Sequence, residues 1–561
     1  MKQHRKKDNE LKLNKNALEV LKRRYLLKDE NGNTIETPLE LFRRIAKAVA
    51  FDSVSEEEFL DILLNLEFLP NTPTLMNAGT DMGQLSACFV IPIEDSLISI
   101  FDAVKSMALI QQSGGGTGFS FAKLRPTGDV VRSTKGVASG PVSFMRVFDT
   151  TTEIIKQGGK RRGANMGILR VDHPDIIDFI NAKTKEGLFS NFNLSVAVDD
   201  KFMNAVKRDG DHELINPRNW EVVKKVKARD IWARIIKLAW KTGDPGVIFI
   251  DEINRHNPTP QMGKMESTNP CGELPLLPFE SCNLGSINLA LMINQGTIDW
   301  ERLERTIASG VKFLDNVIDI NKYPLAKIEE ITKANRKIGL GVMGFADMLI
   351  QLGIPYDSEE GINTGENIMK FIQERSHLTS QKLAKEWGAF LNFEGSIFEN
   401  PMRNATTTSI APTGTISIIG GCSSGIEPLF ALSYVRNVLD GTKLIEVNPY
   451  FEAAVKKRGL YSEELMKKIA KTGTIAGIKE IPDDIKRVFV TAFDIEPEWH
   501  VKMQAAFQKY CDNAVSKTIN FPNDVDVREV EKAFMLAYEL KCKGITIYRY
   551  GSKMQQVLYI G

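Results

Sequence analysis

Short apolar segments alternate with helical patterns in the first half of the chain, and this alternation limits the possible folds more than any other feature. Strands are expected at residues 86–93, 166–171, 193–198 and 247–250, and helices at residues 97–112, 143–156, 174–182 and from residue 201 onward. Because consecutive parallel strands need crossover connections, the alternation predicts an α/β fold with a central sheet.

The opening part of the chain has a different, helical pattern. Apolar residues recur at helical spacing over residues 16–27 and 37–68. Capping boxes at Thr37 and at Ser55, each with a glutamate three residues later, mark two helix starts. The sequence therefore predicts a helical N-terminal region over residues 1–70.

The segment from Asn269 to Leu289 contains two of the six cysteines, Cys271 and Cys282. Three prolines exclude a helix through its first part, so Cys271 is expected on a constrained loop between a carboxamide and the carboxylate of Glu273. A chemical role fits this polar setting better than core filling does. The alternative, that both thiols are small buried apolar groups, stays open, more so for Cys282.

Further loops contain glycine and hydroxyl side chains. Residues 71–79 are expected to form a turn-rich link, and residues 113–118 and 157–163 are glycine-rich. Residues 411–420 resemble a phosphate-binding loop that leads into a strand. Residues 113–118 lack the spacing of a P-loop or a dinucleotide fingerprint. For residues 113–118 and 411–420, a plain turn remains an equal alternative.

Composition excludes several classes of function. A net charge of +1 argues against a nucleic-acid binder, and no apolar run is long enough for a membrane span. The basic start lacks the apolar core of a secretory signal, and six cysteines in such a chain indicate a reducing, cytoplasmic setting. No Cys-x-x-Cys or His-x-His spacing occurs, so no metal site is expected.

Five short segments together carry a family resemblance: Asn71-Thr72-Pro73-Thr74, Ser86-Ala87-Cys88, Asn269-Pro270-Cys271-Gly272-Glu273, Ser281 to Leu289, and Pro412-Thr413-Gly414-Thr415. In this order they resemble the catalytic chain of ribonucleotide reductases, above all the adenosylcobalamin-dependent class II enzymes. The resemblance covers the chain from about Asn16 to Leu558. It implies a ten-stranded α/β barrel of two half-barrels over residues 71–561, with a finger loop at about residues 265–285 and Cys271 at its tip.

The resemblance also assigns the chemistry. Cys271 would become a thiyl radical that takes hydrogen from the ribose 3′ carbon. Glu273 would act as general base on the 3′-hydroxyl, and Asn269 would hold and polarise the sugar. Cys88 and Cys282 would supply protons and electrons as the 2′-hydroxyl leaves as water, and would end each turnover as a disulfide.

Two groups of binding residues follow from the same resemblance. Substrate-binding positions are Thr72, Ala87, Cys88, Gly116, Asn269, Pro270, Cys271, Gly272, Glu273, Pro412, Thr413, Gly414, Thr415 and Ile416. Positions for a deoxynucleotide or ATP effector are Asp95, Ser96, Leu97, Arg125 and Arg132. In most of the family the effector site lies where two subunits meet, which implies a homodimer.

The class of reductase follows from residues near the C-terminus. Class I chains receive their radical from a separate metal-containing subunit through two adjacent tyrosines. The matching place here is Tyr548-Arg549-Tyr550, where Arg549 interrupts the pair. No ATP-binding cone and no glycyl-radical motif is visible either, so class II with adenosylcobalamin is the interpretation. The residues that contact the cofactor stay unassigned.

Two alternatives remain: a class I-type catalytic subunit that needs a separate radical-generating subunit, and a non-catalytic nucleotide-binding regulator. A diphosphate substrate is favoured over a triphosphate. Most relatives carry a C-terminal Cys-x-x-Cys that reduces the active-site disulfide again, and no such pair precedes Gly561. Either the chain is truncated or a thioredoxin-like reductant acts directly. Cys422, Cys511 and Cys542 are interpreted as structural.

Overall fold

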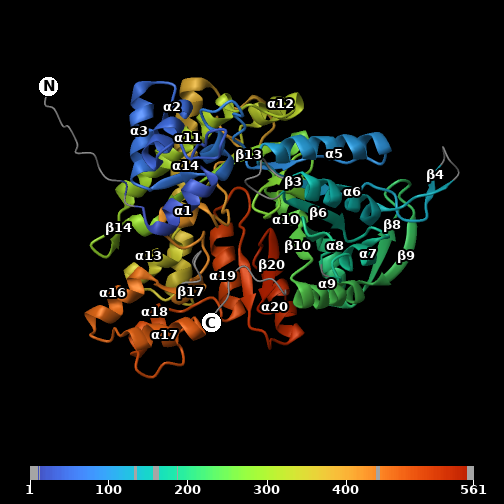
Figure 1. The fold of residues 1–561 in the computed structure, drawn as a ribbon. Coiled ribbons are helices and arrows are strands. Elements are labelled where there is room, and N and C mark those ends of the chain that lie inside the picture. The colour runs from blue at the N-terminus through green and yellow to red at the C-terminus, as the bar shows by residue number, and fades with distance from the viewer. Residues whose placement is uncertain are drawn as a thin grey trace.

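The computed structural model describes residues 11, 13–131, 136–155, 163–185, 187–437 and 443–552. The N-terminal part is helical, with α1 (Lys15–Arg24), α2 (Pro38–Val49) and α3 (Ser53–Leu64) at the blue end of the ribbon in Figure 1. The capping box at Thr37 is confirmed, because Thr37 and Glu40 bond each other's backbone. The box predicted at Ser55 is wrong: Asp52 is the N-cap and Ser55 is its third helical residue.

The predicted turn-rich link is also wrong in part, because residues 72–77 form a short helix. Strand β1 (Phe68–Pro70) is followed directly by α4 (Thr72–Asn77). The Asn71 side chain accepts a hydrogen bond from the Thr74 backbone, 3.0 Å away, and Pro73 lies in the first turn, where its missing N–H is tolerated. Thr72 is thereby placed at the first position of a helix.

Five parallel strands form the first half of the central sheet. They are β2 (Cys88–Val90), β3 (Gly116–Ser120), β6 (Asn165–Arg170), β7 (Phe192–Val198) and β10 (Gly246–Phe249), paired in this order. The crossover segments contain α5 (Leu97–Gln112), α6 (Pro141–Ile154), α7 (Ile176–Ile180), α8 (Asp200–Arg208) and α9 (Ala228–Thr242). The predicted alternation of strands and helices is confirmed.

The second half contains β13 (Ser281–Asn288), β16 (Ile338–Met343), β19 (Thr518–Phe521) and β20 (Gly544–Arg549). Strand β1 also belongs to this half, where it pairs antiparallel with β13. Strand β16 runs parallel to β13, and β19 runs parallel to β20. Two parallel bridges, Leu340 to Thr408 and Ile410 to Val515, connect these pairs through residues 408–410. The associated helices are α11 (Trp300–Ile320), α12 (Ala326–Asn335), α13 (Phe345–Leu352), α14 (Glu359–Trp387), α19 (Pro497–Gln508) and α20 (Val527–Glu539).

The two halves meet along two antiparallel seams. Strand β2 pairs with β13 at one seam, and β10 pairs with β20 at the other. Together with the two bridges, these seams return the pairing to its start, so the mixed ten-stranded sheet closes into a ring. Figure 1 shows both halves with helices on their outer sides. The predicted α/β barrel of two half-barrels is confirmed.

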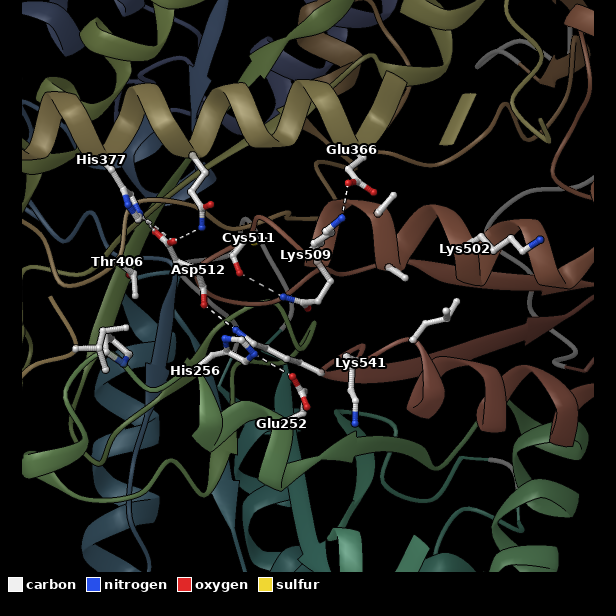
Figure 2. A pocket seen from close by; sticks show the side chains of 18 of the residues that line it. Glu252, His256, Glu366, His377, Thr406, Lys502, Lys509, Cys511, Asp512 and Lys541 are labelled. Carbon is white, nitrogen blue, oxygen red and sulfur yellow. Dashed lines mark hydrogen bonds and ion pairs between the residues drawn. The ribbon is translucent and has the colours of Figure 1, made fainter. Parts of the chain in front are cut away.

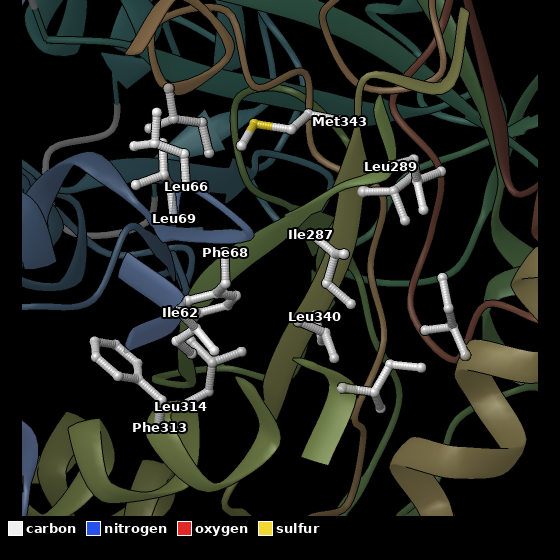
Figure 3. Close-up of a cluster of buried hydrophobic side chains, with 14 of the residues drawn as sticks. Ile62, Leu66, Phe68, Leu69, Ile287, Leu289, Phe313, Leu314, Leu340 and Met343 are labelled. Atoms are coloured by element: carbon white, nitrogen blue, oxygen red, sulfur yellow. The ribbon is translucent and has the colours of Figure 1, made fainter. Parts of the chain in front are cut away.

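Apolar packing separates the outside of the barrel from its inside. Outside the second half, Phe68, Ile287 and Leu340 pack with Phe313 and Leu314 of α11 (Figure 3). Along β6, Leu169 joins the outer cluster whereas Ile168 joins an inner one. This alternation is expected for a strand with both faces buried.

The inside of the barrel is filled by the finger loop. After α10 (Ile250–Arg255), strands β11 (Ser267–Thr268) and β12 (Pro275–Leu276) form a short hairpin. Its backbone passes so close to β3 that a Cβ atom on Gly118 would lie 1.7 Å from the Thr268 carbonyl oxygen. A Cβ on Gly116 would lie 2.9 Å from the Pro270 ring. The glycines at 116 and 118 therefore make room for the finger loop.

The remaining elements lie outside the barrel sheet. Hairpin strands are β4 (Val130–Val131), β5 (Gly136–Val137), β8 (Asp211–Ile215), β9 (Val222–Lys227), β14 (Ile293–Asn294), β15 (Thr297–Ile298), β17 (Ser433–Asn437) and β18 (Lys443–Val447). Helices α15 (Ile416–Gly420), α16 (Pro449–Lys457), α17 (Glu463–Thr472) and α18 (Asp483–Val488) complete the fold. The strand predicted after residue 415 is wrong, because α15 occupies that place. None of the helices in the described ranges is long and apolar enough to cross a membrane.

Candidate functional site

The tip of the finger loop, residues 269–273, is a tight turn that presents a thiol. The Gly272 backbone N–H donates to the Asn269 carbonyl at 3.1 Å, and the Leu274 N–H donates to the Asn269 side-chain oxygen at 3.0 Å. Gly272 has φ +82°, a left-handed conformation that glycine adopts without strain. The turn leaves the Cys271 side chain exposed inside a largely buried loop.

Both half-barrels hold this tip in place. From the first half, the Asn193 side chain on β7 donates to the Pro270 carbonyl at 2.7 Å. From the second half, the Ser409 hydroxyl and the Ala514 backbone N–H both donate to the Glu273 carbonyl at 2.9 Å. The Glu273 side chain is buried. The thiol of Cys271 is thus carried by a loop that is fixed on either side.

Cys88 and Cys282 lie directly opposite each other on β2 and β13, in the seam beside the tip. Directly opposed residues in an antiparallel pair have the Cα separation that a disulfide requires. Both thiols are buried, with exposed fractions of 4% for Cys88 and 0% for Cys282. The Asn269 side chain donates to the Cys88 sulfur at 3.1 Å, which connects the tip to the pair.

Burial raises the pKa of both paired thiols. For Cys88 the negative charge of Glu273 adds to the effect, and the pKa lies well above its usual value. The pKa of Cys282 is also raised, chiefly by desolvation. Leu274 and Leu276 of the finger loop pack with both cysteines in one apolar cluster. The pair is therefore kept as protonated thiols, shielded from bulk water.

Several of the predicted substrate positions gather around this tip. The Gly116 backbone N–H donates to the Ala87 carbonyl at 2.8 Å, Cys88 pairs with Gly116 across β2 and β3, and Gly116 contacts the Pro270 ring. Ala411, next to the 412–416 loop, packs against the cluster that contains the two cysteines. The structure thus brings Ala87, Cys88, Gly116 and the fingertip residues together.

The 412–416 loop is contacted by the N-terminal region. Thr413 has φ +55°, and its hydroxyl accepts a hydrogen bond from the Gly425 N–H at 2.7 Å. Arg24 of α1 donates to the Thr415 hydroxyl at 3.4 Å. The neighbouring residue, Tyr25, shares a 2.9 Å hydrogen bond with the Thr72 hydroxyl. Helix α1 thereby connects two segments that the sequence predicts to bind substrate.

The predicted effector residues form a separate group at the start of α5. Arg125 makes a 2.8 Å ion pair with Asp95, and Ser96 caps α5 by accepting from the Ser99 N–H at 3.2 Å. Leu97 is exposed. Arg132 lies outside the described residues. Because α5 has 16 residues, its two ends are roughly 24 Å apart, and only its C-terminal end leads into β3 at the fingertip.

A cavity of about 720 Å³ lies elsewhere, between α14, α19, α10 and the segment before β20 (Figure 2). In Figure 2, His377 points toward Asp512 and His256 toward Glu252, at 3.0 and 2.9 Å. Burial lowers the pKa of Lys543 in its wall to about 8. None of the predicted site residues lines this cavity. The cavity is therefore separate from the predicted substrate and effector positions.

Asn193, Ser409 and Ala514, the three anchors of the tip, were missed by sequence reasoning. Only Asn193 carries a signal, as a carboxamide at the start of an apolar strand. The other two act through a serine hydroxyl and a backbone N–H in segments without regular secondary structure. In the described ranges, no group of three or more histidine, cysteine, aspartate or glutamate side chains is placed to hold a metal ion.

Two family models match the chain. The model of the "ribonucleotide reductase, barrel domain" matches residues 86–401 and 396–548, and that of the "ribonucleotide reductase, all-alpha domain" matches residues 11–83. The chain belongs to the ribonucleotide reductase family. It is a catalytic chain, since the models cover the barrel that carries the three cysteines.

The named relatives of this ribonucleotide reductase include vitamin B12-dependent ribonucleoside-diphosphate reductases. The one from Thermoplasma acidophilum is 51% identical, over 99% of this chain and 81% of the relative. The one from Mycobacterium tuberculosis H37Rv is 50% identical, over 98% and 80%. The subunit alpha of a ribonucleoside-diphosphate reductase from Chlamydia muridarum is 30% identical, over 92% and 57%.

A solved relative supports the fold of this ribonucleotide reductase. The class Id alpha subunit from Actinobacillus ureae superimposes with a TM-score of 0.81 at 26% sequence identity. The superposition covers 96% of this chain and 97% of that one. This chain and a class Id alpha subunit thus share the same barrel fold.

Proposed function

We propose that this reductase converts ribonucleoside diphosphates to deoxyribonucleoside diphosphates with adenosylcobalamin as its radical source. The observation that carries the proposal is the arrangement of three cysteines. Cys271 is exposed at a fixed tip, and the Cys88–Cys282 pair is buried beside it. The names of the two relatives at 51% and 50% identity support both the adenosylcobalamin cofactor and the diphosphate substrate.

In the proposed reaction, the Cys271 thiyl takes the hydrogen atom from the ribose 3′ carbon. Glu273 removes the proton of the 3′-hydroxyl, and Asn269 holds the sugar through its carboxamide. The 2′-hydroxyl then leaves as water. Cys88 and Cys282 together give two hydrogen atoms and become a disulfide, and the hydrogen taken by Cys271 returns to the 3′ carbon. Reduction at carbon 2′ is thereby balanced by oxidation of the pair.

Adenosylcobalamin, when bound, supplies a carbon-centred radical by homolysis of its cobalt–carbon bond. The chain fits this role because Cys271 is exposed, so a bulky group can approach its sulfur. Arg549 also breaks the tyrosine pair. Its guanidinium stacks on Trp240, with 4.3 Å to the ring centroid, and donates to the Trp240 carbonyl at 2.8 Å. At position 549 the chain thus has a packed arginine instead of a tyrosine that could pass on a radical.

The substrate would bind around the fingertip through the predicted positions: Thr72, Ala87, Gly116, Pro270, Gly272, Pro412, Thr413, Gly414, Thr415 and Ile416. The contacts among Ala87, Gly116 and Pro270 support this placement. So does the contact between α1 and the 412–416 loop. Backbone N–H groups of such loops suit phosphate oxygens.

We propose effector binding by Asp95, Ser96, Leu97, Arg125 and Arg132, with a homodimer formed along α5. Leu97, Ile98 and Phe101 are 63%, 79% and 52% exposed, a run of large apolar side chains that a second copy would cover. A thioredoxin-like dithiol as reductant and a cytoplasmic location complete the proposal. The division into a helical region over residues 1–70 and a barrel over residues 71–561 stays a prediction.

The test is a turnover assay with CDP and with CTP, each with adenosylcobalamin and a dithiol, with and without added dTTP or dATP. Deoxynucleotide formation from CDP in clear preference to CTP supports the proposal. Preference for CTP would overturn the diphosphate assignment. Activity without any response to either effector would overturn the effector site.

A further inference from the structure

A buried ion pair lies behind the two paired cysteines. The Lys337 ammonium is 2.6 Å from a Glu280 carboxylate oxygen, and both side chains are 1% exposed. That oxygen also accepts from the Leu277 backbone N–H at 2.7 Å, and the other oxygen accepts from the Asn335 side chain at 2.5 Å. Two hydrogen bonds thus fix the Glu280 carboxylate, and the carboxylate in turn positions the Lys337 ammonium.

Strand register places Lys337 beside Cys282. In the parallel pair of β13 and β16, Asn283 is opposite Ile338, so the residues just before them, Cys282 and Lys337, are neighbours. On the other side of β13, Cys282 is opposite Cys88. Cys88, Cys282 and Lys337 therefore form a row across three adjacent segments of the barrel.

The two sulfurs of the row face different charges. Lys337 opposes the rise in the pKa of Cys282, which burial dominates and to which Glu280 and Glu273 add. Around Cys88, burial, Glu273 and the other two cysteines all raise the pKa, and only the Asn269 hydrogen bond lowers it. A thiolate therefore forms more easily at Cys282 than the burial of this thiol alone suggests.

A buried lysine–glutamate pair is a poor device for stability. The desolvation free energy of the two charges is about as large as the energy of their attraction. Apolar side chains of similar size at such positions often give equal or greater stability. The location of this pair beside a redox-active cysteine suggests that it serves the chemistry instead.

We propose that Lys337, positioned by Glu280, directs the reduction of the Cys88–Cys282 disulfide, so that the reductant attacks Cys88 and Cys282 leaves as a thiolate. The proposal rests on the proposed function of these cysteines as the pair oxidised in each turnover. Access agrees with it, since Cys88 is the slightly exposed member and contacts the fingertip, whereas Cys282 is fully enclosed. Lys337 is a positioning residue and touches no substrate.

The step is a thiol–disulfide exchange with an external dithiol. One thiolate of the dithiol bonds to the Cys88 sulfur, the Cys88–Cys282 bond breaks, and Cys282 leaves with the electron pair beside Lys337 before it takes a proton. The second thiolate of the dithiol then attacks the dithiol sulfur that is bonded to Cys88. The dithiol closes into a disulfide, and Cys88 is released and protonated. The dithiol is oxidised to a disulfide and the enzyme is reduced by two electrons.

The direct test uses the oxidised wild-type chain with a limiting amount of 2-mercaptoethanol, a monothiol that lacks the fast intramolecular second step of a dithiol, so the mixed disulfide accumulates. The reaction is stopped with acid, the chain is unfolded and treated with iodoacetamide, and peptide mass spectrometry locates the modifications on Cys88 and Cys282. The proposal expects the mercaptoethanol adduct on Cys88 and the carbamidomethyl group on Cys282. The reverse assignment, or an even mixture, would overturn it.

The second test compares the Lys337→Met, Glu280→Gln double variant, which leaves no stranded charge, with wild type. Reduction of the disulfide by dithiothreitol should slow about tenfold, because a poorer leaving group departs more slowly. A Lys337→Arg variant, which keeps the cation, should recover most of the rate. The matched control is Arg44→Met with Glu36→Gln, a largely buried ion pair at 2.7 Å in the N-terminal region, which should leave the rate unchanged.

Single turnover of chemically pre-reduced enzyme separates this proposal from the one on which it rests. The double variant should form deoxyribonucleotide in one turnover at close to the wild-type amount. Wild-type chain that forms none would instead contradict the proposed function. If reduction of the double variant is as fast as that of wild type, Lys337 has no part in regeneration. If the double variant does not fold, the adduct mapping on wild type decides alone.

Discussion

The fingertip and the seam beside it place the same side chain in opposite surroundings. Cys271 lies on a turn, exposed, on a loop that both half-barrels anchor. Cys88 and Cys282 lie on regular strands, buried and opposed. A thiol that must be reached by a bulky radical source needs an open position. A thiol pair that must exchange electrons only with a bound sugar or a specific reductant needs a closed one.

The difference teaches that backbone type, more than the residue itself, sets the role of each cysteine. A turn with three nearby prolines cannot pair its backbone regularly, so it projects a side chain away from the sheet. Opposed positions on antiparallel strands already have the Cα separation that a disulfide requires. Neither position can substitute for the other.

The largest expected effect comes from removing the exposed thiol. Cys271→Ser should lower turnover by roughly 10³-fold or more, as happens when a residue that reacts directly is lost, because a serine hydroxyl does not form an equivalent radical. Steady-state deoxynucleotide formation measures this. Cys422→Ser, a half-buried thiol outside the site, should be close to wild type and serves as control. Substantial multiple turnover by Cys271→Ser would remove Cys271 from its assigned role.

Removing a buried thiol should stop cycling and leave the open thiol working. Cys88→Ser and Cys282→Ser should each lose about 10²-fold or more of multiple turnover, since no disulfide can form. Radical formation on mixing with adenosylcobalamin and CDP, followed by electron paramagnetic resonance, should persist in both. Loss of that signal in either variant would show that the two regions do not act separately.

Chemical modification should follow the same division. At pH 8, iodoacetamide should alkylate Cys271 about 100-fold faster than Cys88 or Cys282, because only exposed thiolates react well. The raised pKa of the buried pair keeps both as thiols, so their rates should stay low up to pH 9. Quantitative peptide mass spectrometry over a pH series measures all three. Comparable rates at the three sites would contradict the burial of the pair.

A smaller effect is expected from a change in the packing of the finger loop. Gly118→Ala should destabilise the fold by about 2–3 kcal/mol, because its Cβ overlaps the Thr268 carbonyl and the loop must shift. Denaturant unfolding measures the loss, and activity should fall with it. Gly477→Ala, where no atom lies within 4 Å of the new Cβ, should change the free energy of unfolding by less than about 0.5 kcal/mol. Equal stability of the two variants would show that β3 does not confine the finger loop.

Local signals in the sequence predicted some parts of the molecule well. Helix α5 begins and ends at the predicted residues 97 and 112, because Ser96 caps it and glycines follow. The loop around Cys271 follows from its prolines. Other places were decided by neighbours: residues 72–77 became a helix through the Asn71 cap, and residues 416–420 became α15, where a run rich in isoleucine favours a strand.

The closed barrel and the pairing of the cysteines were beyond local signals. Cys88 and Cys282 are 194 positions apart, and the bridges through residues 408–410 have no strand pattern of their own. The resemblance to the family supplied both. The anchors Asn193 and Ser409, and the Glu280–Lys337 pair, depend on contacts between distant segments, which no spacing in one sequence reveals.

This chain alone, through Cys271, is proposed to perform the reduction with adenosylcobalamin. The most direct measurement incubates the purified chain without oxygen with adenosylcobalamin, dithiothreitol and CDP, and quantifies deoxycytidine diphosphate by chromatography. We expect many turnovers with no second subunit, and none when Cys271 is serine. Product that forms only after a separate metal-containing subunit is added, or that forms equally well with Cys271→Ser, would contradict it.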